Sequence, residues 1–318
     1  MLPYLLKRFG LSLLTLLGIS LLIFTLLTLA PGNPLGELAT NPNITETVRE
    51  NLRRSLGLDQ PLPVRYVKWF LSLCRGDFGY SFTSRSPVLD LILQRLPTTL
   101  SIMGLAYLFS VLIALPMGII AALKHQKWLD YWLSSLSVIG FSLPPFLTGL
   151  ILIIVFSVQL GWLPFIYDST LQVNSLQTLV EQLQQSILPI LVLTLYQSAI
   201  LFRFVRSAVL EELPQDYIRT AYAKGLTHRG VITHHLLRNA LIPVVTLIAL
   251  DLPTIFTGAL VTEQIFRVPG MGALMIESIY RNDTPVVMAV TFLYAVLIIV
   301  FGALADGLYC LLDPRIKV

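Results

Sequence analysis

The ionisable and nucleophilic side chains of this chain do not form a set that could catalyse a reaction. His234 and His235 are adjacent, so on a helix their side chains point about 100° apart and make a poor pair of metal ligands. The carboxylates are dispersed, and the sequence lacks the G-x-x-x-x-G-K-[ST] loop that cradles nucleotide phosphates. We therefore predict no catalytic residue, no metal site and no cofactor bound by this chain.

Three polar residues lie where polarity is costly. Asp251 falls deep in an apolar run, and a carboxylate at membrane depth has to face a cavity or a hydrogen-bonding partner. Tyr196 and Gln197, in another apolar run, could hydrogen-bond a polar ligand or a neighbouring helix. We take these three as candidates for the lining of a path through the protein, with buried structural hydrogen bonds as the alternative.

The composition indicates that a membrane is the solvent of this protein. Of its 318 residues, 55% are hydrophobic and only 13% are charged. The net charge of +4 is scattered in short clusters between apolar runs, so nucleic acid is a poor candidate for a partner. Cys74 and Cys310 are predicted near opposite membrane faces, and no disulfide framework follows.

Six apolar runs approach the length of about 20 residues that a helix needs to cross a hydrocarbon core of about 30 Å. They are approximately Phe9–Ala30, Thr98–Leu123, Trp132–Leu160, Ile187–Phe202, Ala240–Val261 and Val286–Leu312. The first is longer than the apolar part of a secretory signal and lacks an A-x-A cleavage site, so we interpret it as a retained helix. The prediction is an all-α polytopic membrane protein with kinks at Pro144-Pro145 and at Pro253.

The distribution of Lys and Arg predicts the orientation. With the N-terminus in the cytoplasm, twelve of the 22 basic residues fall inside, six of them between residues 203 and 240. The short loops on the other side hold only Arg267 and Arg281, and the remaining eight lie in the long segment 31–96. Both termini are therefore predicted to be cytoplasmic.

These assignments divide the chain into three parts. Residues 1–30 are the first transmembrane helix, 31–96 are an ordered periplasmic cap, and 97–318 are a five-helix core with a cytoplasmic loop at 207–240. A second external segment, 161–186, has no Lys or Arg and several glutamines, so we interpret it as a polar surface segment.

The cytoplasmic loop contains a short amphipathic segment, which we predict to be a helix that begins after Asp216 as its cap. By their spacing, one face of that helix would carry Ile218, Ala221, Tyr222 and Gly225. Ala221 and Gly225 would leave a small gap into which another element could fit, and the flanking Arg219 and Lys224 could pair with acidic groups. Packing on the protein's own membrane domain is the alternative.

The order of these residues resembles the cytoplasmic signature of permeases from binding-protein-dependent ABC importers. That signature is E-A-A, three residues, Gly and a later I-x-L-P; here Arg219-Thr220-Ala221, Gly225 and Leu241-Ile242-Pro243 occupy the corresponding places. The departure at the first two positions is typical of the oligopeptide, dipeptide and nickel branch. Further segments match in the same order: Leu29–Pro34, Gly76–Ser81, Arg95–Leu100, Glu263–Phe266, Pro269–Gly272 and Leu312–Ile316.

The resemblance implies a type I ABC importer permease fold in the inner membrane. Two permease subunits, here a pair of related but different chains, would form the path, and two ATPase subunits carrying ATP and Mg would bind beneath them. An extracytoplasmic solute-binding protein would deliver the solute, and membrane lipid would surround the complex. The residues that this resemblance assigns to contact with the ATPase are Tyr217, Ile218, Arg219, Ala221, Tyr222, Lys224, Gly225 and Leu226.

The branch favours di- or oligopeptides as the solute, with nickel or glutathione as alternatives. Two other classes stay open: an ion-coupled secondary transporter, which would also lack a phosphate loop, and a purely structural membrane subunit. No internal repeat is apparent in the sequence, which weakens the secondary-transporter hypothesis.

Overall fold

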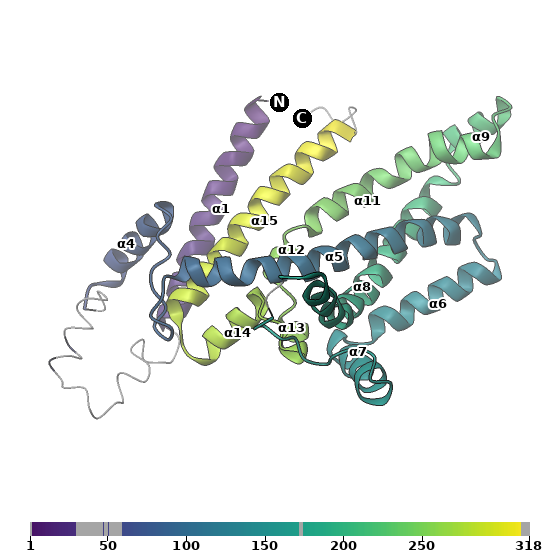
Figure 1. Cartoon of the computed structure of the whole chain (residues 1–318). Coiled ribbons are helices and arrows are strands. Elements are labelled where there is room, and N and C mark those ends of the chain that lie inside the picture. The colour runs from purple at the N-terminus through teal and green to yellow at the C-terminus, as the bar shows by residue number, and fades with distance from the viewer. Residues whose placement is uncertain (1, 30–46, 48–49, 51–58, 172–173, 313–318) are drawn as a thin grey trace. The chain divides into compact units, whose positions relative to one another are not determined.

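The computed structural model describes residues 2–29, 47, 50, 59–171 and 174–312 (Figure 1). Most of the first half of the predicted cap, the motif after Leu29 and the closing motif after Leu312 lie outside these residues. The chain forms two compact units, Met1–Pro97 with Gly270–Val300, and Thr98–Pro269 with Phe301–Val318. The regular elements of the described residues are helices, with a single isolated bridge between Tyr80 and Pro87 and no sheet.

The helices of the first unit pack around aromatic side chains. This unit contains α1 (Leu2–Leu29), α4 (Leu62–Cys74), the start of α5 (Val88–Leu123), α14 (Met271–Tyr280) and most of α15 (Thr284–Leu312). Phe24 of α1 lies 5.5 Å from the ring of Tyr66 and 5.7 Å from that of Trp69, both on α4. Ser20 hydrogen-bonds the Tyr66 hydroxyl at 2.8 Å. These contacts hold α4 along α1.

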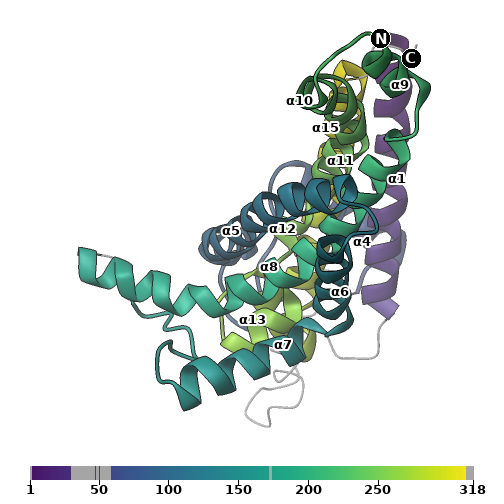
Figure 2. The same ribbon diagram turned by 90° about the vertical axis from the view of Figure 1, so that its right-hand side faces the viewer.

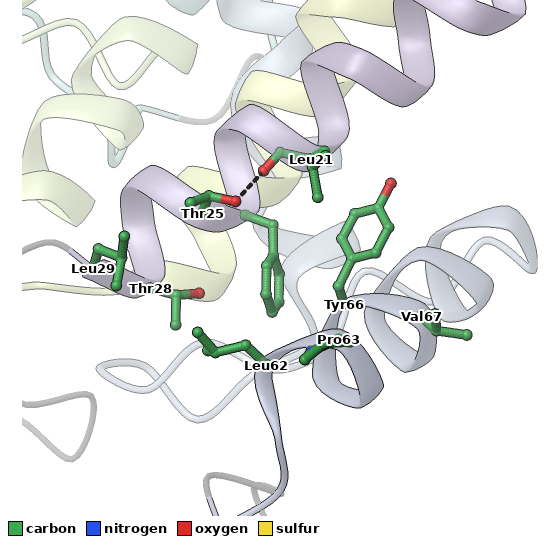
Figure 3. Close-up of a pocket in the computed structure, with 9 residues that line it drawn as sticks. Leu21, Thr25, Thr28, Leu29, Leu62, Pro63, Tyr66 and Val67 are labelled. Atoms are coloured by element: carbon green, nitrogen blue, oxygen red, sulfur yellow. Dashed lines mark hydrogen bonds between the residues drawn. The ribbon is translucent and has the colours of Figure 1, made fainter.

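An apolar groove of about 260 Å³ runs between α1 and α4, as Figure 3 shows. Leu21, Thr25 and Leu29 line it from α1, and Leu62 and Val67 line it from α4. Thr25 turns its hydroxyl back to the Leu21 carbonyl oxygen at 2.7 Å, so the groove presents mainly carbon.

The motif Gly76–Ser81 forms a turn that is fastened to the connection between α14 and α15. Gly76 and Gly79 have φ angles of +79° and +78°, a backbone conformation that glycine adopts at little cost. The buried Asp283 carboxylate accepts hydrogen bonds from the Ser81 hydroxyl at 2.5 Å and from the Phe82 amide at 3.0 Å. The part of the predicted cap that the structure describes here is thus ordered.

The second unit is organised around α8 (Leu176–Glu212), a single long helix that Figure 2 shows lengthwise. α6 (Trp128–Ser142), α7 (Pro145–Leu152) and α11 (Leu237–Asp251) pack against it. A Cβ placed on Gly118 of α5 would lie 2.8 Å from Val205, and one on Gly140 of α6 would lie 3.0 Å from Ala199. Glycine therefore lets both helices approach α8 closely.

The remaining elements of this unit are short. They are the π-helical segments η1 (Ile153–Gln159) and η2 (Val231–Leu236), and the helices α9 (Asp216–Ala223), α10 (His228–Gly230), α12 (Thr254–Thr257) and α13 (Leu260–Phe266).

Among the described residues, five helices are long and apolar enough to cross a bilayer, and the pair α6 with α7–η1 raises the number to six. This pair is bent by 97° at its break, where Pro144 and Pro145 lie (Figure 1). A proline lacks the amide hydrogen that would continue the helix, which explains the bend that the sequence predicts here. The all-α polytopic fold and the kink are confirmed.

Two predicted boundaries are wrong. The fourth apolar run is only the middle of α8, because Ser175 begins that helix with a capping box to Thr178; residues 176–186 are helical, and most of their side chains are exposed as predicted. Gln185 in this stretch is buried and accepts a hydrogen bond from the Asp168 amide at 2.7 Å. The fifth run ends earlier than predicted, because the helical span His228–Thr257 stops at Gly258, where φ is +75°.

A buried ion pair joins α6 to α8. Asp130, in the first turn of α6, is 1% exposed, and its two carboxylate oxygens accept bonds from Arg206 Nε at 2.6 Å and Nη2 at 2.8 Å. The Gln126 amide and the His125 ring also contact this carboxylate at 3.1 and 3.2 Å. A bidentate pair of this kind fixes both the distance and the rotation between two helices.

We expect the change Arg206→Met to destabilise the folded protein by about 3 kcal/mol, because it leaves the Asp130 charge buried without its main partner. Arg203→Met is the matched control, since Arg203 is exposed and only lies over the Phe141 ring at 4.5 Å. Thermal unfolding of both variants in detergent measures the difference. Equal melting temperatures would show that the pair does not hold the helices.

Candidate functional site

The predicted cytoplasmic helix exists as α9, but with a different start. Gln215 precedes it as the capping residue, and Asp216 lies in its first turn rather than at the cap as expected. Ile218 and Ala221 are each 4% exposed and pack in the same core as Val205 of α8. One face of α9 is therefore buried in its own unit, so these two residues position the helix and are not available to a partner.

The opposite side of α9 and the turn after it are open to solvent. Arg219, Tyr222, Lys224 and Leu226 are all exposed. Arg219 approaches Asp216 at 3.5 Å, but both side chains are largely hydrated, so this pair contributes little stability. The exposed set combines cationic, aromatic and aliphatic groups, which suits contact with another protein. Figure 1 shows α9 labelled at one end of the second unit.

Gly225 does not share a helix face with Ala221, and the small gap predicted between them is wrong. It lies beyond the end of α9 with φ of +79°, and its amide bonds the Tyr222 carbonyl oxygen at 2.9 Å. No atom lies within 4 Å of the place where its Cβ would be. Glycine is needed here because of the backbone conformation that ends the helix and not because of close packing.

Two tyrosines fix the turns on either side of α9. The Tyr217 hydroxyl donates to the Glu212 carboxylate, and burial together with this carboxylate raises the pKa of Tyr217 to about 12. Tyr217 therefore stays a neutral donor at physiological pH. Tyr222 stacks on His228 with ring centroids 6.0 Å apart, and its hydroxyl lies 2.7 Å from the His228 Nδ1.

Of the three candidate path residues, the structure joins two. Gln197 Nε2 on α8 donates to Asp251 Oδ2 on α11 at 3.1 Å, and both side chains are half-buried. No hydrogen bond connects Tyr196 to either of them among the described residues. Tyr107 on α5, which the sequence reasoning missed, donates its hydroxyl to the Ile248 carbonyl oxygen at 3.0 Å and so fastens α5 to α11.

The reasoning from sequence also missed the pair of Asp130 and Arg206. No local signal identifies this pair, because two arginines, Arg203 and Arg206, follow the apolar run of α8. Within the part of the chain that the structure describes, no three His, Cys, Asp or Glu side chains gather closely enough to hold a metal ion.

Two family descriptions cover nearly the whole chain. Residues 114–318 match the inner membrane component of binding-protein-dependent transport systems, and residues 1–103 match the N-terminal part of such a membrane component. The chain belongs to this family. It is accordingly a multi-pass inner-membrane permease subunit of an ABC importer, a class in which separate subunits hydrolyse ATP.

Named relatives match over their full length. The oligopeptide transport system permease protein AppB of Bacillus subtilis is 41% identical, with 100% of both chains covered. The di/tripeptide transport system permease protein DppB of Pseudomonas aeruginosa is 38% identical over 100% of this chain and 99% of that protein.

Two solved structures share the fold. A chain of the MetNI methionine ABC transporter in inward-facing conformations gives a TM-score of 0.53 at 19% identity, over 71% of this chain and 97% of that one. A chain of an amino acid ABC transporter crystallised with histidines gives a TM-score of 0.50 at 17% identity, over 72% of this chain and 95% of that one. The predicted permease fold and the membership in the ABC permease family are both confirmed.

We expect Gly225→Ala to loosen α9 and its following turn, because a non-glycine residue pays about 1 to 2 kcal/mol in the left-handed region. Gly225→Asn is the control, since asparagine tolerates this conformation better. Hydrogen exchange of the amides between residues 216 and 230 should be roughly tenfold faster in the alanine variant than in the asparagine variant. Identical exchange in the two variants would argue against a conformational role.

Proposed function

We propose that this chain forms part of the transmembrane path of an ATP-driven importer for di- or oligopeptides. The observation that carries the proposal is the full-length similarity to AppB and DppB, whose names state oligopeptide and di/tripeptide transport. Nickel and glutathione are the alternative solutes. An ion-coupled transporter and a purely structural subunit are not retained, because the family is that of binding-protein-dependent transport systems.

The proposed assembly contains four kinds of partner. They are a second, related but different permease, two ATPase subunits that bind ATP and Mg, an extracytoplasmic solute-binding protein and the surrounding membrane lipid. Nucleic acid is not among them. The chain itself would bind no cofactor. Membership in the family supports a complex with other transporter subunits, and the exact composition is part of the proposal.

We further propose that the exposed side of α9 is the surface onto which an ATPase subunit docks. Arg219, Tyr222, Lys224, Gly225 and Leu226 would touch the partner. Ile218, Ala221 and Tyr217 would hold the helix to the permease, since all three pack in the core that contains Val205 and Val209 of α8. A movement imposed on the exposed side would then reach α8 through packed side chains.

This arrangement places both termini and the coupling loop 207–240 in the cytoplasm. Residues 31–96 form the external cap, 1–30 the first span, and 97–318 the core. Asp251, Gln197 and Tyr196 are the residues proposed to line the path, and the half-buried pair of Asp251 and Gln197 supports this placement.

The proposal predicts uptake that depends on ATP and on peptide. In proteoliposomes that contain both permeases, the ATPase subunits and the binding protein, a labelled di- or oligopeptide should accumulate only when ATP is present on the ATPase side. Ionophores that collapse ion gradients should leave this uptake intact. Accumulation of nickel or glutathione without any peptide would contradict the proposed solute class.

A further inference from the structure

Asp251 lies near a break in the apolar span that carries it. α11 ends at this residue, Leu252 and Pro253 keep helical φ and ψ angles, and the backbone leaves the helix after α12, at Gly258, where φ is +75°. Backbone that leaves the helix at membrane depth is tolerated only where protein or a water-filled cavity surrounds it. Asp251 lies seven residues before Gly258, within about two helical turns of the place where such a cavity could open.

Within the described part of the chain, one oxygen of the carboxylate has a hydrogen-bond donor. Oδ2 accepts the hydrogen bond from Gln197 Nε2 at 3.1 Å, and the backbone carbonyl oxygen of Asp251 accepts the Thr254 hydroxyl at 2.6 Å. Among the described residues, none donates a hydrogen bond to Oδ1, and no Lys, Arg or His forms an ion pair with the carboxylate. The side chain is half-buried.

The nearby Tyr107 hydroxyl does not donate a hydrogen bond to Asp251 Oδ1. The Tyr107 hydroxyl donates to the Ile248 carbonyl oxygen at 3.0 Å, one turn before Asp251 on α11. It thus steadies the helix that presents the carboxylate. A metal ion is a poor occupant, because no group of three acidic, cysteine or histidine side chains lies together in the described residues.

The geometry points to a cationic hydrogen-bond donor as the occupant, and we propose that Asp251 binds the protonated amino group of a solute as it passes. An anionic oxygen at membrane depth gains most from a charged donor, and a primary ammonium brings three hydrogens in a compact group. Di- and oligopeptides carry this group at their N-terminus. This inference rests on the proposed function and names the feature of the peptide that the path would recognise.

The test compares two peptides in the complete reconstituted transporter. One has a free α-amino group and the other is its N-acetyl analogue, and the pair is chosen so that the binding protein captures both, as its fluorescence shows. Initial import rates are measured for the wild type, Asp251→Asn and Asp251→Glu. Asp306→Asn is the matched control, since it neutralises another carboxylate within an apolar span. The same binding protein serves every variant, so its own preference cancels when ratios of rates are compared.

We expect Asp251→Asn to lower the ratio of free to acetylated import by roughly tenfold, the loss of one charge-assisted hydrogen bond. Asp251→Glu should recover most of this ratio, and Asp306→Asn should leave it at the wild-type value. An unchanged ratio in Asp251→Asn, or equal slowing of both peptides, would overturn the inference. A wild-type complex that imports neither peptide would instead refute the proposed function.

Discussion

The structure depends on the absence of water from the hydrocarbon core of the membrane. Every backbone amide and carbonyl there needs a partner within the protein, and a helix supplies these partners from its own segment. The described spans are helical, and within them we single out two places where a helix is interrupted. These are Pro144-Pro145, where α6 and α7 meet at 97°, and Gly258, where the span that contains α11 and α12 ends. Asp251, seven residues before the second place, hydrogen-bonds Gln197 of α8.

The long helix α8 connects the features that matter for function. Arg206 binds Asp130 of α6, Gln197 binds Asp251 of α11, and Val205 packs in the core that also buries Ile218 of α9. The proposed docking surface and the proposed solute contact therefore attach to the same element, at Val205 and Gln197, eight residues apart along it. A helix of this length that is clamped on several sides is suited to carry a movement without losing it to local bending.

Much of the fold could be predicted from the sequence, because the length of an apolar run reflects the thickness of the bilayer and the ordered motifs reflect the family. The bend at Pro144-Pro145 was predictable for the same reason, because proline removes a backbone donor. The part of α8 before Ile187 could not be predicted. A capping box at Ser175 starts the helix there, and the glutamines that follow are typical of a polar loop. The position of Gly225 was also mistaken, because spacing alone does not reveal where a helix ends. Long-range pairs such as Asp130 with Arg206 leave no local signal.

The central claim is that the exposed side of α9 carries the ATPase subunit, and site-specific photo-crosslinking tests it most directly. A photoreactive residue replaces Leu226, which is 44% exposed in the turn after α9, or Leu176, which is 82% exposed at the start of α8. Illumination of the assembled, ATP-hydrolysing complex should link position 226 to the ATPase subunit and leave position 176 without that product. Absence of the product at position 226, or its formation at position 176, would contradict the account.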